Sequence, residues 1–115
     1  MAIRLPADDA LAERIVAALR ALPATVRSSL FHAMAQIDRY PVLPRERVAV
    51  LNDRYDVHVV RLARGGCHAV LVCEPDGRDI VLAGITGSRP SARRAATLAA
   101  VALDVPVLDI HLDAG

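Results

Sequence analysis

The chain has no lysine and no tryptophan, and its aromatic residues are one phenylalanine and two tyrosines. All 14 basic residues are therefore arginine, which excludes a Schiff-base lysine and the lysine of a phosphate-binding P-loop. With so few aromatic rings available to stack on bases, binding of single-stranded nucleic acid by stacking is disfavoured. The net charge of +1 also predicts no strong non-specific attraction to nucleic acid or anionic membranes.

Cysteine is scarce, and long apolar runs are absent. Cys67 and Cys73 lie in or beside one predicted strand, where they would be roughly 20 Å apart, too far for a disulfide. We expect reduced thiols in a cytoplasmic protein. No apolar run approaches the ~18 residues of a membrane span, and residues 1–6 lack the apolar stretch of a signal peptide. No membrane partner is therefore expected.

Length and composition predict one domain over residues 1–115. Apolar residues make up 54% of the chain, enough for a real core. They are mostly Ala, Val, Leu and Ile, and such small side chains let helices and strands approach closely. Residues 2–5 are expected to form a short strand before the first helix.

The N-terminal third predicts a helical hairpin over residues 8–39. Asp8 or Asp9 offers an N-cap for the first helix, and apolar residues follow at intervals of three and four. Pro23 ends this helix, and Thr25 offers a cap for the second one. The connection between the two helices is very short, which is typical of an antiparallel helix pair.

The middle of the chain predicts a sheet meander over residues 48–86. A loop over 41–47 precedes it, and the expected strands are 48–51, 56–63, 68–74 and 79–86. The last two of these strands are apolar on both faces, as expected for strands in the middle of a sheet. The sheet therefore needs a cover on each face, and the helical hairpin can provide only one.

The last third predicts a helix over about 91–103 and a final strand over 105–112. The expected apolar stripe of the helix is Ala95, Leu98, Ala99, Val101 and Ala102. If this last strand is a parallel neighbour of the preceding strand, the two strands and the helix form a right-handed βαβ unit. The alternative is that a dimer partner covers the second face. The fold class is α+β: a single-layer antiparallel sheet covered by helices, with an α/β-like C-terminal unit.

Three segments resemble the RelE/ParE toxin superfamily over roughly residues 8–90. They are Tyr55-Asp-Val-His-Val-Val-Arg61, Gly66-Cys-His68-Ala-Val-Leu-Val72, and the strand 79–86 followed by Ser88-Arg89. His68 departs from the family, which usually has arginine there. The resemblance implies a bacterial toxin that is neutralised by an antitoxin partner. Such a toxin either acts on gyrase or cleaves mRNA without a metal ion.

RNA cleavage of that type needs a proton carrier and a cation for the phosphorane. Arg61 and Arg89 are the candidates for the cation. His68 is the candidate proton carrier, because histidine titrates near neutral pH, and Tyr55 is a candidate to assist the reaction. This hypothesis predicts that Arg61, Arg89 and either Arg45 or Arg47 share one concave surface. The alternative is structural: Arg61 reaches water from the strand edge, and His68 lies near the surface at a strand start.

A second candidate site lies between the last meander strand and the following helix. Gly87, Ser88, Arg89 and Ser91 precede a helix start, where backbone N–H groups and an arginine favour an anion. This arrangement predicts binding of a phosphate-bearing ligand. The segment matches neither glycine-rich phosphate fingerprint, and the alternative is an ordinary tight turn.

Polar residues also share one face of the predicted last strand. Asp109, His111 and Asp113 could place two carboxylates and an imidazole around a cation. Neighbours on a strand face are, however, about 7 Å apart, so three in a row rarely converge on one ion. A solvated polar face is favoured, and neither a metal nor another cofactor is expected.

A third functional class is a non-enzymatic module. Its apolar sheet face would bind a protein partner or a second copy of the chain, giving a homo-oligomer. This hypothesis predicts an exposed apolar patch too large for a monomer.

Overall fold

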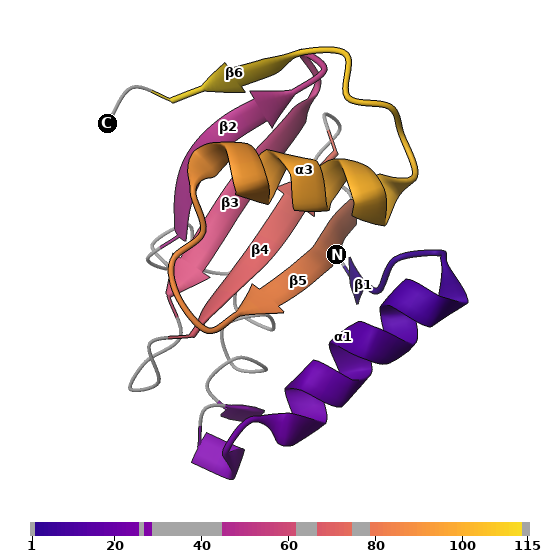
Figure 1. The fold of residues 1–115 in the computed structure, drawn as a ribbon, viewed down its shortest axis with the longest axis vertical. Helices are drawn as coiled ribbons and strands as arrows, with labels where there is room; N and C mark the ends of the chain where they lie inside the picture. Colours follow the sequence, from indigo (N-terminus) through magenta and orange to yellow (C-terminus); the bar gives the residue numbers. More distant parts are fainter. Residues whose placement is uncertain (1, 26, 29–44, 62–66, 75–78, 114–115) are drawn as a thin grey trace.

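The computed structural model describes residues 2–25, 27–28, 45–61, 67–74 and 79–113. Within them the chain forms an α+β fold, as the sequence predicts (Figure 1). In chain order the elements are β1 (Ala2–Arg4), α1 (Asp9–Ala21), β2 (Arg45–Leu51), β3 (Tyr55–Arg61), β4 (His68–Cys73), β5 (Asp79–Thr86), α3 (Ala92–Leu103) and β6 (Ile110–Leu112).

The strands form one six-stranded sheet in the order β1-β5-β4-β3-β2-β6. Neighbours from β5 to β6 are antiparallel, and β1 alone pairs in parallel, with β5. The meander β3-β4-β5 therefore occupies the middle of the sheet. Edge positions go to the two three-residue strands, β1 and β6, which limits the exposed hydrogen-bonding edges.

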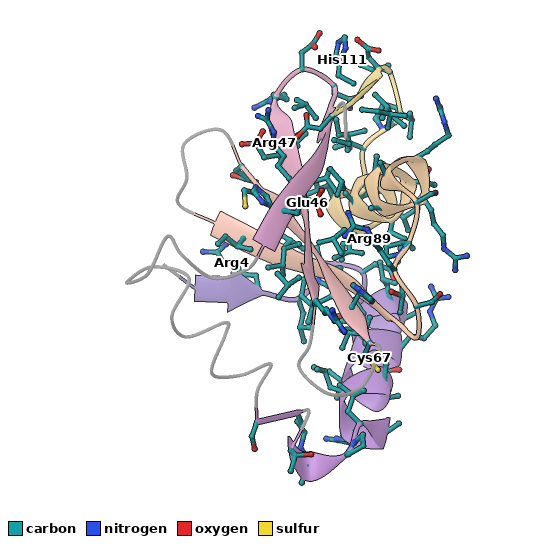
Figure 2. All side chains as sticks on the ribbon, turned by 90° about the vertical axis from the view of Figure 1, so that its left-hand side faces the viewer. Arg4, Glu46, Arg47, Cys67, Arg89 and His111 are labelled. Atoms are coloured by element: carbon teal, nitrogen blue, oxygen red, sulfur yellow. The ribbon has the colours of Figure 1, made fainter. Side chains whose placement is uncertain are left out.

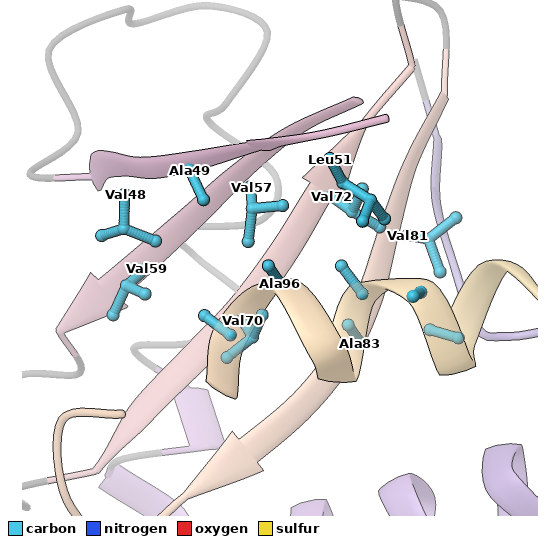
Figure 3. Packing of buried hydrophobic residues seen from close by; sticks show 14 residues of the cluster. Val48, Ala49, Leu51, Val57, Val59, Val70, Val72, Val81, Ala83 and Ala96 are labelled. Carbon is cyan, nitrogen blue, oxygen red and sulfur yellow. The ribbon is translucent and has the colours of Figure 1, made fainter. Parts of the chain in front are cut away.

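The sheet has a hydrophobic core on each face, as the two-sided apolar strands require. Alternation along β4 divides the cores: Val70 and Val72 face α3, whereas Ala69 and Leu71 face α1. The α3 core consists of Val48, Ala49, Leu51, Val57, Val59, Val70, Val72, Val81, Ala83, Ala95, Ala96, Ala99, Ala100 and Ala102 (Figure 3). The α1 core consists of Ile15, Leu19, Val60, Ala69, Leu71, Ile80 and Leu82.

Helix α1 begins and ends where the sequence predicts. The side chain of Asp8 accepts a hydrogen bond from the backbone N–H of Leu11 at 2.9 Å, which makes it the N-cap. Leu22 adopts an extended conformation just before Pro23 and ends the helix. The predicted second helix of the hairpin lies almost entirely outside the described residues.

Strand β2 starts at Arg45, so the prediction of a loop through residue 47 is wrong at its end. The reason is long-range pairing: Arg45 is the Cα partner of Val60 and Glu46 that of Val59. A bulge between Arg47 and Ala49 then shifts the register. Hydrogen bonding to β3 therefore extends β2 to Arg45, Glu46 and Arg47, whose polar sequence does not by itself predict a strand.

Helix α3 lies across one face of the sheet and packs on it through alanines (Figure 1). Ser91 is its N-cap and Asp104, in the left-handed region at φ 54°, is its C-cap. The predicted stripe is wrong at Val101, which is 56% exposed, and it missed the buried Ala96 and Ala100. The smallest side chains face the sheet because they let the helix backbone approach the valines of the strands.

The C-terminal segment differs most from its prediction. Only Ile110–Leu112 form a strand, and residues 105–109 are irregular, held by hydrogen bonds to Asn52. Strand β6 pairs with β2 within the chain and is antiparallel to it. Since β4, β3 and β2 separate β5 from β6, these strands are not neighbours and the βαβ unit is wrong.

Candidate functional site

One end of the sheet brings together candidates from three strands. Arg61 at the end of β3 is the Cα partner of His68 at the start of β4, and His68 is the partner of Thr86 at the end of β5. Partners across a sheet have side chains on the same face. Arg61 follows Val59 by two residues and His68 precedes Val70 by two residues, and both valines face α3. The row of Arg61, His68 and Thr86 therefore lies on the α3 face.

The segment after Thr86 forms the wall of a pocket of about 490 Å³, here named the loop pocket. All four predicted ligand-binding residues, Gly87, Ser88, Arg89 and Ser91, line it. The remaining lining residues are Ile85, Thr86, Pro90 and Arg94. The structure thus places the predicted anion site around one concave surface at the start of α3.

Hydrogen bonds within the segment fix the shape of the loop pocket. Thr86 Oγ1 donates to the carbonyl of Ser88 at 2.7 Å and lies 3.5 Å from the carbonyl of His68. Ser91 Oγ accepts from the backbone N–H of Arg94 at 3.1 Å, and the Ser91 carbonyl accepts from the N–H of Ala95 at 2.9 Å. The chain therefore leaves β5 and enters α3 with a defined path.

The start of α3 makes the loop pocket favour negative charge, whereas the charge of Arg89 is offset by Glu46. Arg89 forms an ion pair of 2.5 Å with Glu46 of β2, which holds the loop against the sheet (Figure 2). Arg93 and Arg94 occupy the first turn of α3, which has no acidic residue. Cations at the positive end of a helix dipole are unfavourable, so this turn would be stabilised by an anion.

The four predicted catalytic residues do not all converge. Arg61, His68 and Arg89 lie at the same end of the sheet, whereas Tyr55 begins β3, about 20 Å from Arg61 along the strand. The Arg54 guanidinium lies 5.0 Å from the centre of the Tyr55 ring instead. An RNA-cleaving site at the Arg61 end would have to work without Tyr55.

His68 is buried, with 8% exposure, so the expectation that it lies near the surface is wrong. The reason is its central position: β4 has strands on both sides and a hydrophobic core on both faces. Burial limits the access of solvent and ligands to this imidazole.

Arg47 is engaged elsewhere, and the Arg45 side chain lies outside the described residues. Arg47 bonds to Asp113 at 2.9 Å and lies 3.6 Å from Asp56. The Asp113 hydrogen bond and charge, with Asp56, raise the pKa of Arg47 above its ordinary value, so the guanidinium stays charged at neutral pH. Its Cα partner is His58, on the opposite face from Glu46, so Arg47 does not join the loop pocket.

The sequence prediction missed Thr86, Arg94 and Glu46. Arg94 had a detectable signal, because it follows the N-cap Ser91 by three residues and its N–H bonds to that side chain. Glu46 had no such signal in the sequence, because it contacts Arg89 across 43 residues of the chain. Of the polar row predicted for the last strand, Asp113 pairs with Arg47, whereas His111 contacts both Asp109 and Asp53.

Comparison with protein-family models, with curated proteins and with solved structures gave no match to this chain. Among the helices that the structure describes, none has both the length and the apolar character needed to cross a membrane.

Proposed function

We propose that the protein binds a phosphate-bearing ligand in the loop pocket. The observation that supports this best is that Arg89, Arg94, Ser88 and Ser91 line one pocket. None of its lining residues is acidic. Guanidinium groups suit phosphate because their planar N–H fork matches two phosphate oxygens at once.

The size of the loop pocket fits a small ligand. Binding sites for small molecules and cofactors commonly enclose about 300–1,000 Å³, and this pocket has about 490 Å³. Its apolar contribution comes from Ile85 and Pro90, so recognition would rest mainly on charge and hydrogen bonds. The ion pair with Glu46 would orient Arg89 before the ligand arrives.

A second candidate function is RNA cleavage by a toxin-type enzyme with an antitoxin partner. The observation that favours it is the cross-strand pairing of Arg61 and His68, in the row that ends at Thr86 beside the loop pocket. In this proposal Arg61 and Arg89 stabilise the phosphorane and His68 moves the proton. The loop pocket would then bind the RNA backbone.

Binding is tested by thermal unfolding with inorganic phosphate, a mononucleotide and a short single-stranded RNA. Arg94→Ala is the test variant, and Arg93→Ala is its matched control, because Arg93 shares the helix turn but does not line the pocket. We expect the mononucleotide to raise the Tm of the wild type and of Arg93→Ala. Arg94→Ala should bind roughly tenfold more weakly, since a charge-assisted hydrogen bond is lost.

The outcomes separate the two functions. If no phosphate compound raises the Tm, or if Arg93→Ala loses as much affinity as Arg94→Ala, the loop pocket is not the binding site. If the wild type cleaves the RNA and Arg61→Ala does not, the toxin-type enzyme is favoured. Ligand binding without cleavage supports the binding module.

A further inference from the structure

Three side chains of types that can bind a metal ion, from two separate segments, converge at the other end of β3. Asp53 lies in the turn between β2 and β3, Asp109 precedes β6, and His111 lies within β6. His111 Nε2 is 2.9 Å from Asp53 Oδ1 and 2.8 Å from Asp109 Oδ2. One donor atom from each residue lies within 4.8 Å of the other two. His111 is far from Arg89 in Figure 2.

The backbone holds the two segments in place. Asn52 and Asp53 both adopt left-handed conformations, with φ of 54° and 57°, which turn the chain sharply after β2. Asn52 Nδ2 donates to the Pro106 carbonyl at 2.8 Å, and Asn52 Oδ1 accepts from the backbone N–H of Leu108 and Asp109. These bonds hold the backbone segments that carry Asp53 and Asp109 beside each other.

Strand pairing places the imidazole. His111 is the Cα partner of Val50, and Ile110 is the partner of Leu51, the last residue of β2 before the turn. The imidazole thus reaches the turn from the neighbouring strand. Neighbours on one strand face are too widely spaced for Asp109, His111 and Asp113 to converge readily on one ion. This objection does not apply here, because Asp53 in the turn provides the third ligand in place of Asp113.

The contacts of His111 Nε2 place one nitrogen against two carboxylate oxygens, an arrangement compatible with a shared metal ion. This nitrogen has one hydrogen or one lone pair, so it cannot make two full hydrogen bonds to two carboxylates. Its distances of 2.8 and 2.9 Å to the two oxygens are hydrogen-bond distances, slightly shorter than those between adjacent ligands of one ion. At metal–ligand distances of about 2.1 Å, adjacent ligands are roughly 3.0–3.4 Å apart.

We propose that Asp53, Asp109 and His111 bind one divalent transition-metal ion. The two carboxylates would neutralise its charge, and the imidazole favours Zn²⁺ over Ca²⁺ and Mg²⁺, which prefer oxygen ligands. The side chains of Asp53, Asp109 and His111 are 72%, 50% and 60% exposed, so the ion can enter from solvent. Water would fill the remaining coordination positions.

Such an ion would join the three-residue strand β6 to the β2–β3 turn. An ion that binds the folded state alone stabilises it in proportion to the logarithm of its concentration over Kd. This proposal is independent of the loop pocket, since it uses other residues at the opposite end of β3.

The test uses the full chain after treatment with a chelator. Zn²⁺, Mn²⁺ and Mg²⁺ are added separately to the wild type, His111→Ala, Asp53→Asn and Asp113→Asn, and the Tm is measured. Asp113→Asn is the matched control, because it removes a β6-end carboxylate that bonds to Arg47 instead of the cluster. A second readout is the visible absorption of bound Co²⁺, which does not depend on stability.

We expect Zn²⁺ at about a hundredfold above its Kd to raise the wild-type Tm by roughly 10 °C. Asp113→Asn should keep this response, His111→Ala and Asp53→Asn should lose it, and Mg²⁺ should have little effect. The Co²⁺ absorption should likewise disappear in His111→Ala. The proposal is overturned if the wild type shows no response, or if His111→Ala and Asp53→Asn respond as the wild type does.

Discussion

At the scale of single residues, Asn52 joins two segments that are more than 50 residues apart in sequence. Its amide side chain makes three hydrogen bonds, to the Pro106 carbonyl and to the N–H groups of Leu108 and Asp109. Its backbone N–H donates to the Asp109 carbonyl at 2.7 Å. Asparagine suits this position because it tolerates the left-handed conformation better than most residues with a side chain.

Replacement of Asn52 by Ala should lower the free energy of unfolding by about 1–3 kcal/mol, because backbone groups of residues 106–109 lose their partners. The measurement is urea unfolding. Asn52→Gly is the matched variant: it loses the same hydrogen bonds but adopts φ 54° without strain. Asn52→Gly should therefore be less destabilised than Asn52→Ala. Wild-type stability in both variants would contradict the assigned role.

At the scale of the element, α3 shows why alanine composition matters to the fold. Its five buried residues are all alanine: Ala95, Ala96, Ala99, Ala100 and Ala102. The opposing sheet face is mainly valine, with Val57, Val59, Val70 and Val72 in contact with the same core. Small residues on the helix and branched residues on the strands give close packing without aromatic side chains. The low aromatic content of the sequence is therefore compatible with a dense core.

Enlarging the buried face of α3 should destabilise the protein. Ala99 is fully buried, so Ala99→Leu should cost about 1–3 kcal/mol by overpacking, measured by chemical unfolding. Val101→Leu is the matched control on the same helix, because Val101 is mostly exposed and should accept a larger side chain within about 0.5 kcal/mol. Equal effects of the two substitutions would show that α3 does not pack through its alanines.

At the scale of the whole molecule, the two hydrophobic cores share the central strands of one sheet. Each of β3, β4 and β5 places alternate residues in the α3 core and the α1 core. Loss of packing on one face therefore weakens the strands that support the other. We expect the two cores to unfold together in one cooperative transition.

The Leu71→Ala variant tests this coupling. Leu71 is 2% exposed in the α1 core, and its truncation should cost about 2–5 kcal/mol. Because the cores share strands, near-ultraviolet and far-ultraviolet circular dichroism should report the same shifted midpoint. Leu108→Ala is the control, since Leu108 is 77% exposed and its truncation should change stability little. Two separate transitions in Leu71→Ala would contradict a shared fold.

The sequence by itself determined the features that depend on local chemistry. Periodicity and capping identified α1 with an N-cap at Asp8 or Asp9, and the two-sided apolar pattern identified β4 and β5 as central strands. The strand predicted over 48–51 ends where β2 ends, just before Asn52 and Asp53. These features follow from interactions between residues close in sequence, so their pattern is visible without the fold.

Tertiary structure alone decided the features that depend on distant partners. The start of β2 at Arg45, the antiparallel pairing of β6 with β2 and the burial of His68 all result from which strands become neighbours. The same holds for the contact of Glu46 with Arg89 and for the cluster of Asp53, Asp109 and His111. Hydrogen bonding between strands and contacts across long loops fixed these positions, and no local pattern encodes such partners.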